Sequence, residues 1–315
     1  MPTETVYGLA ARIDSESAIK KIFAVKERPF FDPLIVHVSS FEQAEACAKS
    51  WNEMNRLLGD KFWPGPLTLV VPKSDLISDL ITSGLDTVGI RWPAHPVAQE
   101  LIQKTGMPLA APSANKFGRT SPTKAQHVSE EFGDSVFVIE AGPSEIGIES
   151  TVLSVRKEGN AFELCILRKG AVLFSQLEKV LQSSGLAYRW VTADKKQSPG
   201  HMQHHYMPSV PLVVCRDTSL KLSELTRILN EKLPQLPDEV EGVKIVKPQG
   251  EIKNIEFLRL SAQPEVAARE LYSQLRSVSA RKPEVLCFIQ TPAQKGEMWE
   301  SVFDRLYKAA SLILD

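Results

Sequence analysis

The chain has 315 residues, of which 43% are hydrophobic and 24% charged, and its formal net charge at pH 7 is -1. This length exceeds what one hydrophobic core usually organises, so two domains are expected. The near-zero net charge argues against a broad basic surface for stable nucleic-acid binding, and no apolar run approaches the roughly 18 residues of a membrane span.

The cysteines and the first residues bear on the cellular compartment. The four cysteines are widely spaced, and none belongs to a C-x-x-C pair. This spacing is typical of neither a zinc site nor a disulfide framework, and it favours reduced thiols. The opening MPTETVYGLAARID has no basic segment followed by an apolar one, so no secretory signal is expected there. These features predict a cytoplasmic protein.

In chain order, residues 1–190 alternate short apolar runs with amphipathic segments, which predicts a mixed α/β domain. Ser15 is placed to cap a helix whose apolar residues recur at helical spacing. The strands expected here are Leu34–Val38, Leu67–Val71, Val88–Arg91, Pro108–Ala111 and Val136–Ile139, with a hairpin of Thr151–Val155 and Phe162–Leu167. One long helix is expected over residues 41–58, and another helix begins at Thr123.

The polar, proline-containing segment 191–211 predicts an interdomain linker. Residues 212–315 then alternate strands with helices, which predicts a small, open, mostly parallel sheet. The expected strands are Leu212–Cys215, Val243–Val246, Ile255–Leu260 and Val285–Ile289, and the expected helices are Leu220–Leu233, Pro264–Ser277 and Trp299–Leu314.

The usual nucleotide-binding and hydrolytic signatures are missing from the sequence, including G-x-x-x-x-G-K-[ST], G-x-G-x-x-G, H-E-x-x-H and G-x-S-x-G. Instead, polar loops punctuated by glycine and proline lie at the ends of predicted strands. These loops are Pro2–Thr5, Lys26–Pro29, Trp63–Pro66, Ser113–Asn115 and Glu149–Thr151. Any chemistry is therefore expected at these loops.

Lys26 and Arg28 lie between a predicted helix and a predicted strand, where both could converge on one anionic group. Lysine supplies a compact charge and arginine a planar fork suited to phosphate oxygens. Their heads are expected to face solvent in the empty site, and solvated charges on a turn are the alternative interpretation. Ser113 and Asn115 follow a buried-looking strand, at the end where ligands of open α/β sheets collect, although taken alone they fit a turn role better than a ligand role.

His37 and Arg91 lie within or at the end of apolar strands. A lone histidine in such a strand is more often a core residue than a ligand. A half-buried arginine requires an anionic partner, which is either a structural carboxylate or one of a substrate. The cluster His201, His204 and His205 lacks acidic or cysteine companions, so no protein metal site is predicted there.

Taken together, these segments resemble the threonylcarbamoyl-AMP synthase family in its two-domain form. The runs that carry the resemblance are PTETVYGLAA, KERPFFDPLIVH, FWPGPLTLVV, TVGIRWPAHP, PLAAPSANKFGRTSPT, ESTVLS, ILRKGA and SPGHMQHHYMP, in that order. The resemblance implies a YrdC-like mixed, twisted sheet with helices and a central cavity, followed by a small Rossmann-like parallel domain. The family's members carry a further helix and strand before the PTET segment, so the resemblance implies an open sheet edge near Thr3.

The resemblance also implies site roles, residue by residue. The residues implied for ATP are Lys26, Arg28, Ser113, Asn115, Ser121, Arg168 and Tyr206. Those implied for threonine are Thr3, His37, Arg91, Ser150 and Thr151, with Arg91 on the carboxylate. His205 and Tyr206 match positions that fold over the active site as a lid. Asp32 stands where the family usually has asparagine, and Gln290–Pro292 replaces a stretch that commonly contains glycine.

The implied reaction condenses L-threonine, bicarbonate and ATP to threonylcarbamoyl-AMP and pyrophosphate, for a threonylcarbamoyl transferase that modifies tRNA. Mg²⁺ is expected to bind through the phosphates. No protein nucleophile is needed, so positioning and cationic screening should dominate catalysis. An RNA-binding module and an inactive relative of the synthase are the alternative hypotheses. A carbamoyltransferase of related fold is disfavoured, because the chain has no zinc-finger segment.

Overall fold

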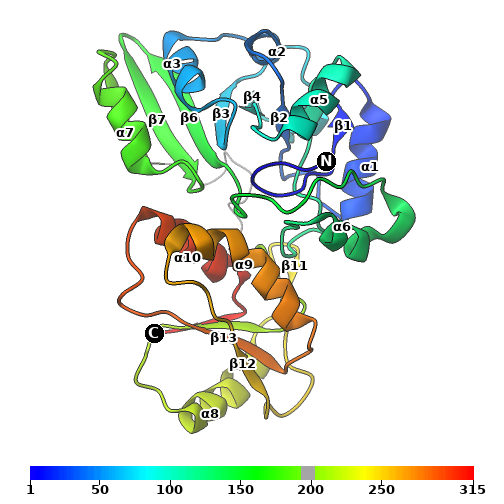
Figure 1. The fold of residues 1–315 in the computed structure, drawn as a ribbon, viewed down its shortest axis with the longest axis vertical. Helices are drawn as coiled ribbons and strands as arrows, with labels where there is room; N and C mark the ends of the chain where they lie inside the picture. The colour runs from blue at the N-terminus through cyan, green and yellow to red at the C-terminus, as the bar shows by residue number, and fades with distance from the viewer. Residues whose placement is uncertain (193–202) are drawn as a thin grey trace. The chain divides into compact units, whose positions relative to one another are not determined.

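The computed structural model describes residues 1–192 and 203–315, and the chain divides into two compact units (Figure 1). The first unit holds residues 1–116 and the described residues from 122 to 192. The second holds residues 117–121 and 203–315. Residues 193–202 of the predicted linker, with His201 among them, lie outside the described residues. The domain boundaries at residues 190 and 212 stay a prediction.

The described strands of the first unit form one mixed sheet of eight, in the order β1-β5-β2-β4-β3-β6-β7-β8. Neighbouring strands are parallel in the pairs β2–β4, β3–β6 and β7–β8 and antiparallel in the others. The strands are β1 (Ala11–Arg12), β2 (Ile35–His37), β3 (Leu67–Pro72), β4 (Thr87–Arg91), β5 (Leu109–Ala110), β6 (Thr151–Glu158), β7 (Ala161–Arg168) and β8 (Tyr188–Trp190). The predicted mixed α/β class is confirmed.

Most helices of this unit pack on one face of the sheet. The helices of the first unit are α1 (Glu16–Lys26), α2 (Phe41–Cys47), α3 (Glu53–Phe62), α4 (Asp79–Thr82), α5 (Pro96–Thr105), α6 (Ala125–Phe132), α7 (Phe174–Gln182) and the short 3-10 turn η1 (Gly133–Ser135). The main apolar cluster joins α1, α2, α3, α4 and α7 to one face. Smaller clusters join α5 to β5, and α6 to the loop around Tyr7.

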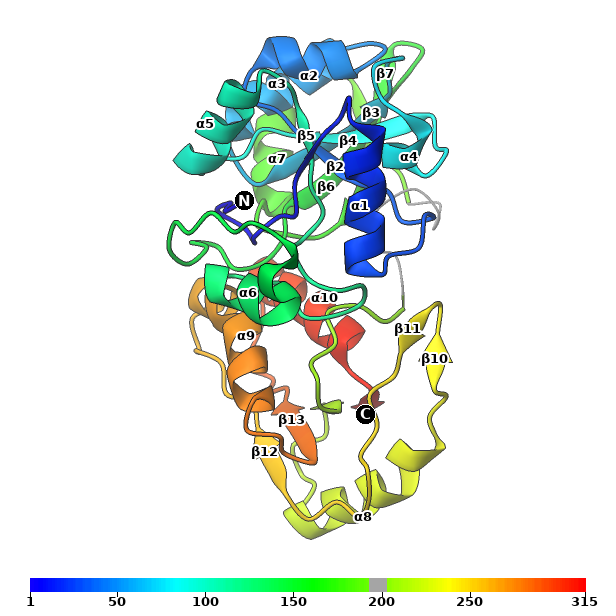
Figure 2. The ribbon, with the colours of Figure 1, turned by 90° about the vertical axis from the view of Figure 1, so that its right-hand side faces the viewer.

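The second unit has a four-stranded parallel sheet within the described residues, in the order β12-β13-β9-β14. Its elements are β9 (Leu212–Cys215), α8 (Leu222–Lys232), η2 (Leu233–Gln235), β10 (Glu239–Val240), β11 (Val243–Lys244), β12 (Ile255–Phe257), α9 (Pro264–Ser279), β13 (Val285–Ile289), α10 (Glu297–Ala309) and β14 (Leu312–Leu314). Figures 1 and 2 show α9 and α10 on one side of this sheet and α8 on the other. The small parallel α/β unit agrees with the prediction.

Several predicted elements were wrong in detail. The long helix over 41–58 is two helices, because Asn52 caps α3 by accepting a hydrogen bond from the Asn55 amide. In the described chain, 136–139 pairs with no strand, although Val136 and Val138 pack on the core. β11 pairs with β10 in a separate ribbon instead of joining the parallel sheet. The last predicted helix ends at Ala309, and β14 follows it, paired with β9.

The cysteines agree with the sequence prediction. All four lie in described residues, are buried and are free thiols. Burial raises the pKa of the Cys47 and Cys287 thiols to about 12. Thiols with such high pKa values are poor nucleophiles at neutral pH, so these cysteines serve as core residues.

Candidate active site

The alternation of side chains along the strands of the first unit places polar residues on one face. Leu67, Leu69 and Val71 of β3 point into the main apolar cluster, so Thr68 between them points to the opposite face. The same alternation applies to His37 next to Val36 on β2, and to Arg91 next to Ile90 on β4. His37 and Arg91 are direct partners across these two parallel strands. The sheet therefore gathers them at one end.

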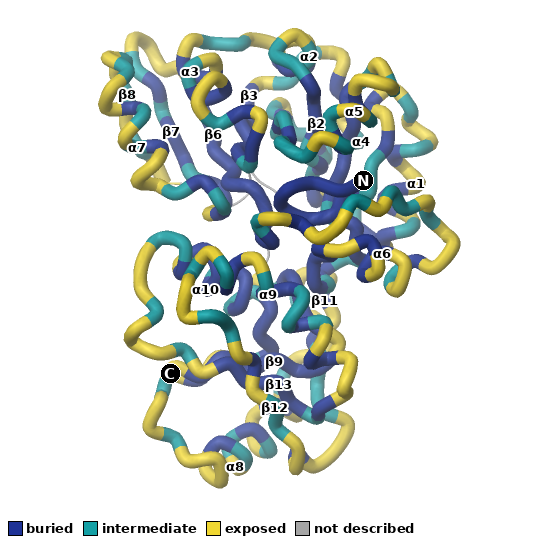
Figure 3. The backbone as a smooth tube through the Cα atoms, in the orientation of Figure 1, coloured by how far each residue is buried: buried dark blue, intermediate teal, exposed yellow. Residues whose placement is uncertain are grey.

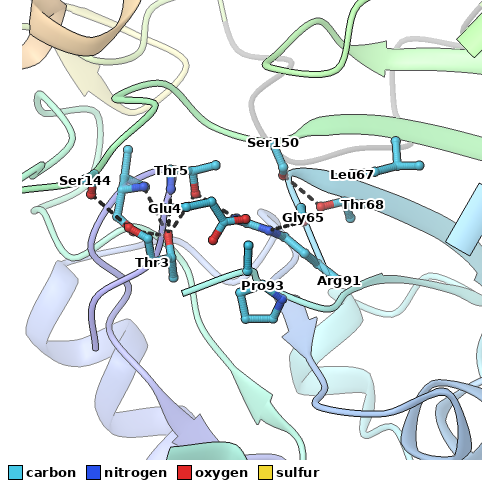
Figure 4. Close-up of polar contacts among 12 residues, drawn as sticks. Thr3, Glu4, Thr5, Gly65, Leu67, Thr68, Arg91, Pro93, Ser144 and Ser150 are labelled. Atoms are coloured by element: carbon cyan, nitrogen blue, oxygen red, sulfur yellow. Dashed lines mark hydrogen bonds and ion pairs between the residues drawn. The ribbon is translucent and has the colours of Figure 1, made fainter. Parts of the chain in front are cut away.

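Arg91 is the centre of a buried polar network (Figure 4). Its guanidinium donates to Glu4 Oε1 at 2.6 Å, to Thr5 Oγ1 at 2.8 Å and to the Gly65 carbonyl at 3.3 Å. Both charged side chains are 5% exposed, so the ion pair lies in a medium that screens it little. Of the two anionic partners considered for Arg91 from the sequence, the structure has the structural carboxylate, Glu4.

The loop that follows the N-terminus carries this carboxylate, and Figure 3 shows the loop as buried. The Thr3 hydroxyl donates to the Val6 carbonyl at 2.6 Å and lies 2.9 Å from the Thr5 hydroxyl. Because the hydrogen of the Thr3 hydroxyl is already engaged, Thr5 is the donor in that second contact. Ser144 also donates to the Thr3 carbonyl. These bonds hold Glu4 and Thr5 against Arg91.

His37 is a buried neutral imidazole. Its Nδ1 lies 3.2 Å from the Ile35 carbonyl, an acceptor that assigns the ring proton to Nδ1. Burial, with a smaller contribution from the Arg91 cation, lowers the pKa of His37 to about 3. The ring can therefore act as a donor or acceptor at neutral pH but carries no charge.

This pKa predicts a loss of stability in acid. Between pH 6.5 and 3 the unfolded chain binds a proton at residue 37 that the folded chain does not, so stability falls as the pH is lowered. Going from pH 7 to pH 5 should lower the free energy of unfolding by about 2 kcal/mol through this residue. Urea unfolding of the wild type and of His37→Asn, which keeps a donor near the Nδ1 position, measures the difference. Equal pH slopes in the two proteins would contradict the assignment.

Ser150 and Arg168 form a second network on the same face as Thr68. The Ser150 hydroxyl lies 2.8 Å from Thr68 Oγ1, and Arg168 donates to both the hydroxyl and the carbonyl of Ser150 at 3.1 Å. The backbone at Gly170 passes close to that of residues 149–151, and a Cβ at Gly170 would lie 2.5 Å from the Glu149 carbonyl oxygen. The family resemblance assigns Arg168 to the ATP site and Ser150 to the threonine site. Hydrogen bonds between the two residues therefore connect the two predicted sites.

Thr151 has a structural contact at the start of β6. Its hydroxyl donates to the Val172 carbonyl at 2.7 Å and accepts from the Val172 amide at 3.0 Å. Both hydroxyl functions are therefore used by the backbone. The contact fixes the segment around Gly170 to the strand that begins beside Ser150.

Lys26 ends α1 and lies with Ser113 and Asn115. Its ammonium donates to the Ser113 carbonyl at 2.6 Å and to the Asn115 carbonyl. The side chain is 1% exposed, so the expectation that it faces solvent was wrong: the two carbonyls hold it in the interior. Burial, and then the nearby Arg28 cation, lower the pKa of Lys26 well below the usual lysine value. An anion bound beside it would favour the protonated form.

Arg28 is also buried, which again contradicts the solvent-facing expectation. It donates to Asp32 Oδ2 at 2.7 Å and to the carbonyls of Asp32 and Pro33. Glu27, between the two cations, has a φ of 51° and ends α1 with a left-handed turn. The turn brings Arg28 back against its own loop, where Asp32 is its anionic partner.

Three residues predicted for the site belong to the second unit. Ser121 is buried there, as are His205 and Tyr206. The Tyr206 ring lies 5.6 Å from the Tyr272 ring and 5.9 Å from the Arg305 guanidinium carbon. Tyr206 has a φ of 65°, which is rare for a bulky side chain and marks a backbone under strain.

The part of the chain that the structure describes contains no group of three histidine, cysteine or acidic residues placed to hold a metal ion. Nor does any helix within those residues have the length and apolar character to cross a membrane.

Sequence reasoning missed Glu4, Thr5 and Thr68 as members of the polar networks. Thr68 gave a detectable signal, because it is a polar residue inside an apolar strand. Glu4 gave none beyond its place in a polar loop, since only the folded chain brings it to Arg91.

Comparisons with known proteins cover both units. A family model described as telomere recombination matches residues 1–170, and the model of the threonylcarbamoyl-AMP synthase C-terminal domain matches residues 172–311. The threonylcarbamoyl-AMP synthase of Pyrococcus abyssi is 38% identical over 98% of this chain and 89% of its own. That of Bacillus subtilis is 36% identical over 98% and 88%. The chain belongs to the threonylcarbamoyl-AMP synthase family.

Solved structures of this family agree. The crystal structure of P. abyssi Sua5 complexed with L-threonine has a TM-score of 0.79 at 35% identity, covering 100% of this chain and 91% of that one. A variant of the same protein, with an adjacent histidine and tyrosine changed to alanine, has a TM-score of 0.77 at 34% identity, covering 100% and 90%. The resemblance seen in the motifs is confirmed, and the chain is an enzyme of this family.

Proposed function

We propose that the protein condenses L-threonine, bicarbonate or CO2, and ATP into threonylcarbamoyl-adenylate and pyrophosphate. The observation that carries this proposal is the full-length match to proteins named threonylcarbamoyl-AMP synthase, one of them solved with L-threonine. The product is a mixed anhydride, which a partner transferase would use to place the threonylcarbamoyl group on an adenosine of tRNA.

The network around Arg91 supports a threonine site on this face of the sheet. The guanidinium would bind the substrate carboxylate, since a fork-to-carboxylate pair both attracts and orients. Neutral His37 would supply an uncharged polar group for the threonine hydroxyl. The Thr3 hydroxyl is engaged with the Val6 carbonyl and the Thr5 hydroxyl, so we assign its contribution to the shape of the loop that lines the pocket. Ser150 would line the same pocket. The Thr151 hydroxyl is engaged with Val172, so we assign its contribution to the backbone.

The ATP phosphates would be bound by Lys26 and Arg28, with Ser113, Asn115, Ser121 and Arg168 on the nucleotide side. Mg²⁺ would arrive with the phosphates as part of the substrate. Lys26 is already oriented by two backbone carbonyls, which removes much of the entropy cost of ordering a long side chain. Arg28 must exchange Asp32 for a phosphate oxygen.

The chemistry requires positioning rather than a protein nucleophile. The amine of threonine adds to CO2 through its nitrogen lone pair and loses a proton, which gives N-carboxythreonine. A carboxylate oxygen of that carbamate attacks the α-phosphorus of ATP, and the bond from that phosphorus to the bridging oxygen breaks to release pyrophosphate. Two anions must approach each other, so buried cations lower the barrier most effectively.

Pyrophosphate release from ATP tests the proposal. Release should require threonine and bicarbonate together and fall to background when either is omitted. Release that ignores threonine would contradict the proposed substrate. A protein that is folded yet releases no pyrophosphate would favour the inactive-relative hypothesis.

Replacing Asp32 by asparagine should free Arg28 for phosphate. The amide keeps the shape and a hydrogen-bond acceptor but removes the competing charge, so we expect the KM for ATP to fall about 3- to 10-fold. The free energy of unfolding should fall by about 1–3 kcal/mol, because a buried charge pair is lost. Asp14→Asn, at an exposed pair with Arg12, is the matched control. A lower stability with an unchanged KM for ATP would contradict the competition.

The lid role of His205 and Tyr206 also remains part of the proposal. Strained backbone is retained where the surrounding structure requires it, and often where function does. The alanine variant solved for P. abyssi Sua5 changes a histidine–tyrosine pair, and this chain has one such dipeptide. We expect Tyr206→Ala to raise the KM for ATP at least about 10-fold while threonine affinity measured without ATP is retained. An unchanged KM for ATP would remove Tyr206 from the nucleotide site.

A further inference from the structure

The carboxylate of Glu4 is only half satisfied. Oε1 accepts from Arg91 at 2.6 Å, whereas buried Oε2 has no hydrogen-bond partner within the described residues. The residue is 4% exposed, so bulk water does not compensate. A buried carboxylate oxygen normally accepts hydrogen bonds, and leaving one without a donor is unfavourable. The arrangement therefore calls for a donor that the described residues do not provide.

The surroundings restrict what that donor can be. Figure 4 shows the Glu4 carboxylate between the Thr3–Thr5 loop and the Arg91 guanidinium, above Pro93. The nearby hydroxyls are directed elsewhere, Thr3 to the Val6 carbonyl and Thr5 to Thr3. A cationic donor fits best, because its charge also attracts the buried carboxylate in surroundings that screen charges little.

Glu4 and Arg91 together present opposite charges side by side. The contacts described for Arg91 use three of the five N–H groups of a guanidinium. A zwitterionic α-amino acid also has opposite charges side by side, on its ammonium and its carboxylate. The buried pair matches that arrangement, with an acceptor for the ammonium next to a donor for the carboxylate.

We propose that Glu4 Oε2 binds the α-amino group of the amino-acid substrate and orients it beside Arg91. This inference rests on the proposed function and deepens it, because it assigns a binding residue for the amine that must react with CO2. Glu4 thereby selects α-amino acids over otherwise identical hydroxy acids. Its link to Arg91 keeps the ammonium and carboxylate subsites in a fixed relation.

Binding of two ligands by calorimetry tests this role. The ligands are L-threonine and (R)-3-hydroxybutyrate, which is threonine without its amino group. The wild type should bind threonine at least about 10-fold more tightly, and Glu4→Gln should abolish most of that preference. The glutamine keeps an acceptor for Arg91 but puts an NH2 donor where Oε2 was. Affinity for the hydroxy acid should change less than about 3-fold. Glu158→Gln, the same change on an exposed hairpin, should alter neither affinity.

The outcomes separate the two proposals. A wild type that binds no threonine overturns the proposed function, and this assignment with it. If the wild type binds both ligands with equal affinity, the role of Glu4 is overturned but the proposed function is not. This measurement uses the wild type only, so it does not depend on a variant that folds. If Glu4→Gln weakens both ligands by the same factor, the residue acts only through Arg91 and the assignment is wrong.

Discussion

Lys26→Met is expected to reduce threonine-dependent pyrophosphate release by at least about 100- to 1,000-fold, the loss typical of removing one preorganised charge from a phosphoryl-transfer site. Methionine keeps most of the side-chain volume but removes the ammonium that Ser113 and Asn115 orient through their carbonyls. Activity is measured at saturating ATP, so that weaker binding does not account for the loss.

The same change should also lower stability, because the two carbonyls lose a buried donor. We expect about 1–3 kcal/mol in the free energy of unfolding, measured with urea. Lys21→Met is the matched control, since Lys21 lies exposed on the same helix and should affect neither quantity. A variant with normal turnover would show that Lys26 serves the fold alone.

Arg91→Ala should cost about 3–5 kcal/mol of stability, since it leaves Glu4 buried without a cationic partner. Adding Glu4→Gln should recover part of that loss, because the uncompensated charge disappears. Activity should stay lost in both proteins, since the group proposed for the threonine carboxylate is missing. Urea unfolding of the wild type, both single variants and the double variant gives the coupling between the two residues.

An exposed pair provides the comparison for this cycle. Arg12 and Asp14 lie 2.7 Å apart with side chains 49% and 35% exposed, so Arg12→Ala should leave the free energy of unfolding almost unchanged. If Arg91→Ala lowers the free energy of unfolding no more than Arg12→Ala does, burial does not strengthen the Glu4–Arg91 ion pair. Additive single-variant effects would contradict a direct interaction.

Local patterns in the sequence predicted most elements of the fold. Apolar runs bounded by polar loops predicted β3, β4, β9 and β13 closely, because a buried strand must be apolar along its length. Helical spacing predicted α1 and its Ser15 cap in the same way. These features depend on neighbours in the chain, so the sequence displays them directly.

One misplaced element depended on a partner distant in the chain, and another depended on a nearby partner. Residues 312–314 are a strand because β9 lies beside them, and their apolar character also suited the end of a helix. β11 pairs with β10, which lies only a few residues away. The apolar run of β13, in contrast, joined the parallel sheet. The choice between helix and strand for short apolar runs is made by tertiary pairing.

By itself the sequence determined the family, the mixed α/β class and the loops that carry the polar residues, because motifs and hydrophobic periodicity are local properties. Only the tertiary structure decided the electrostatics of the site. It buried Lys26 against two carbonyls, paired Arg28 with Asp32, and brought Glu4 to Arg91 across 87 residues of chain. The charge state and partner of a side chain depend on what surrounds it in space, and only the fold supplies those surroundings.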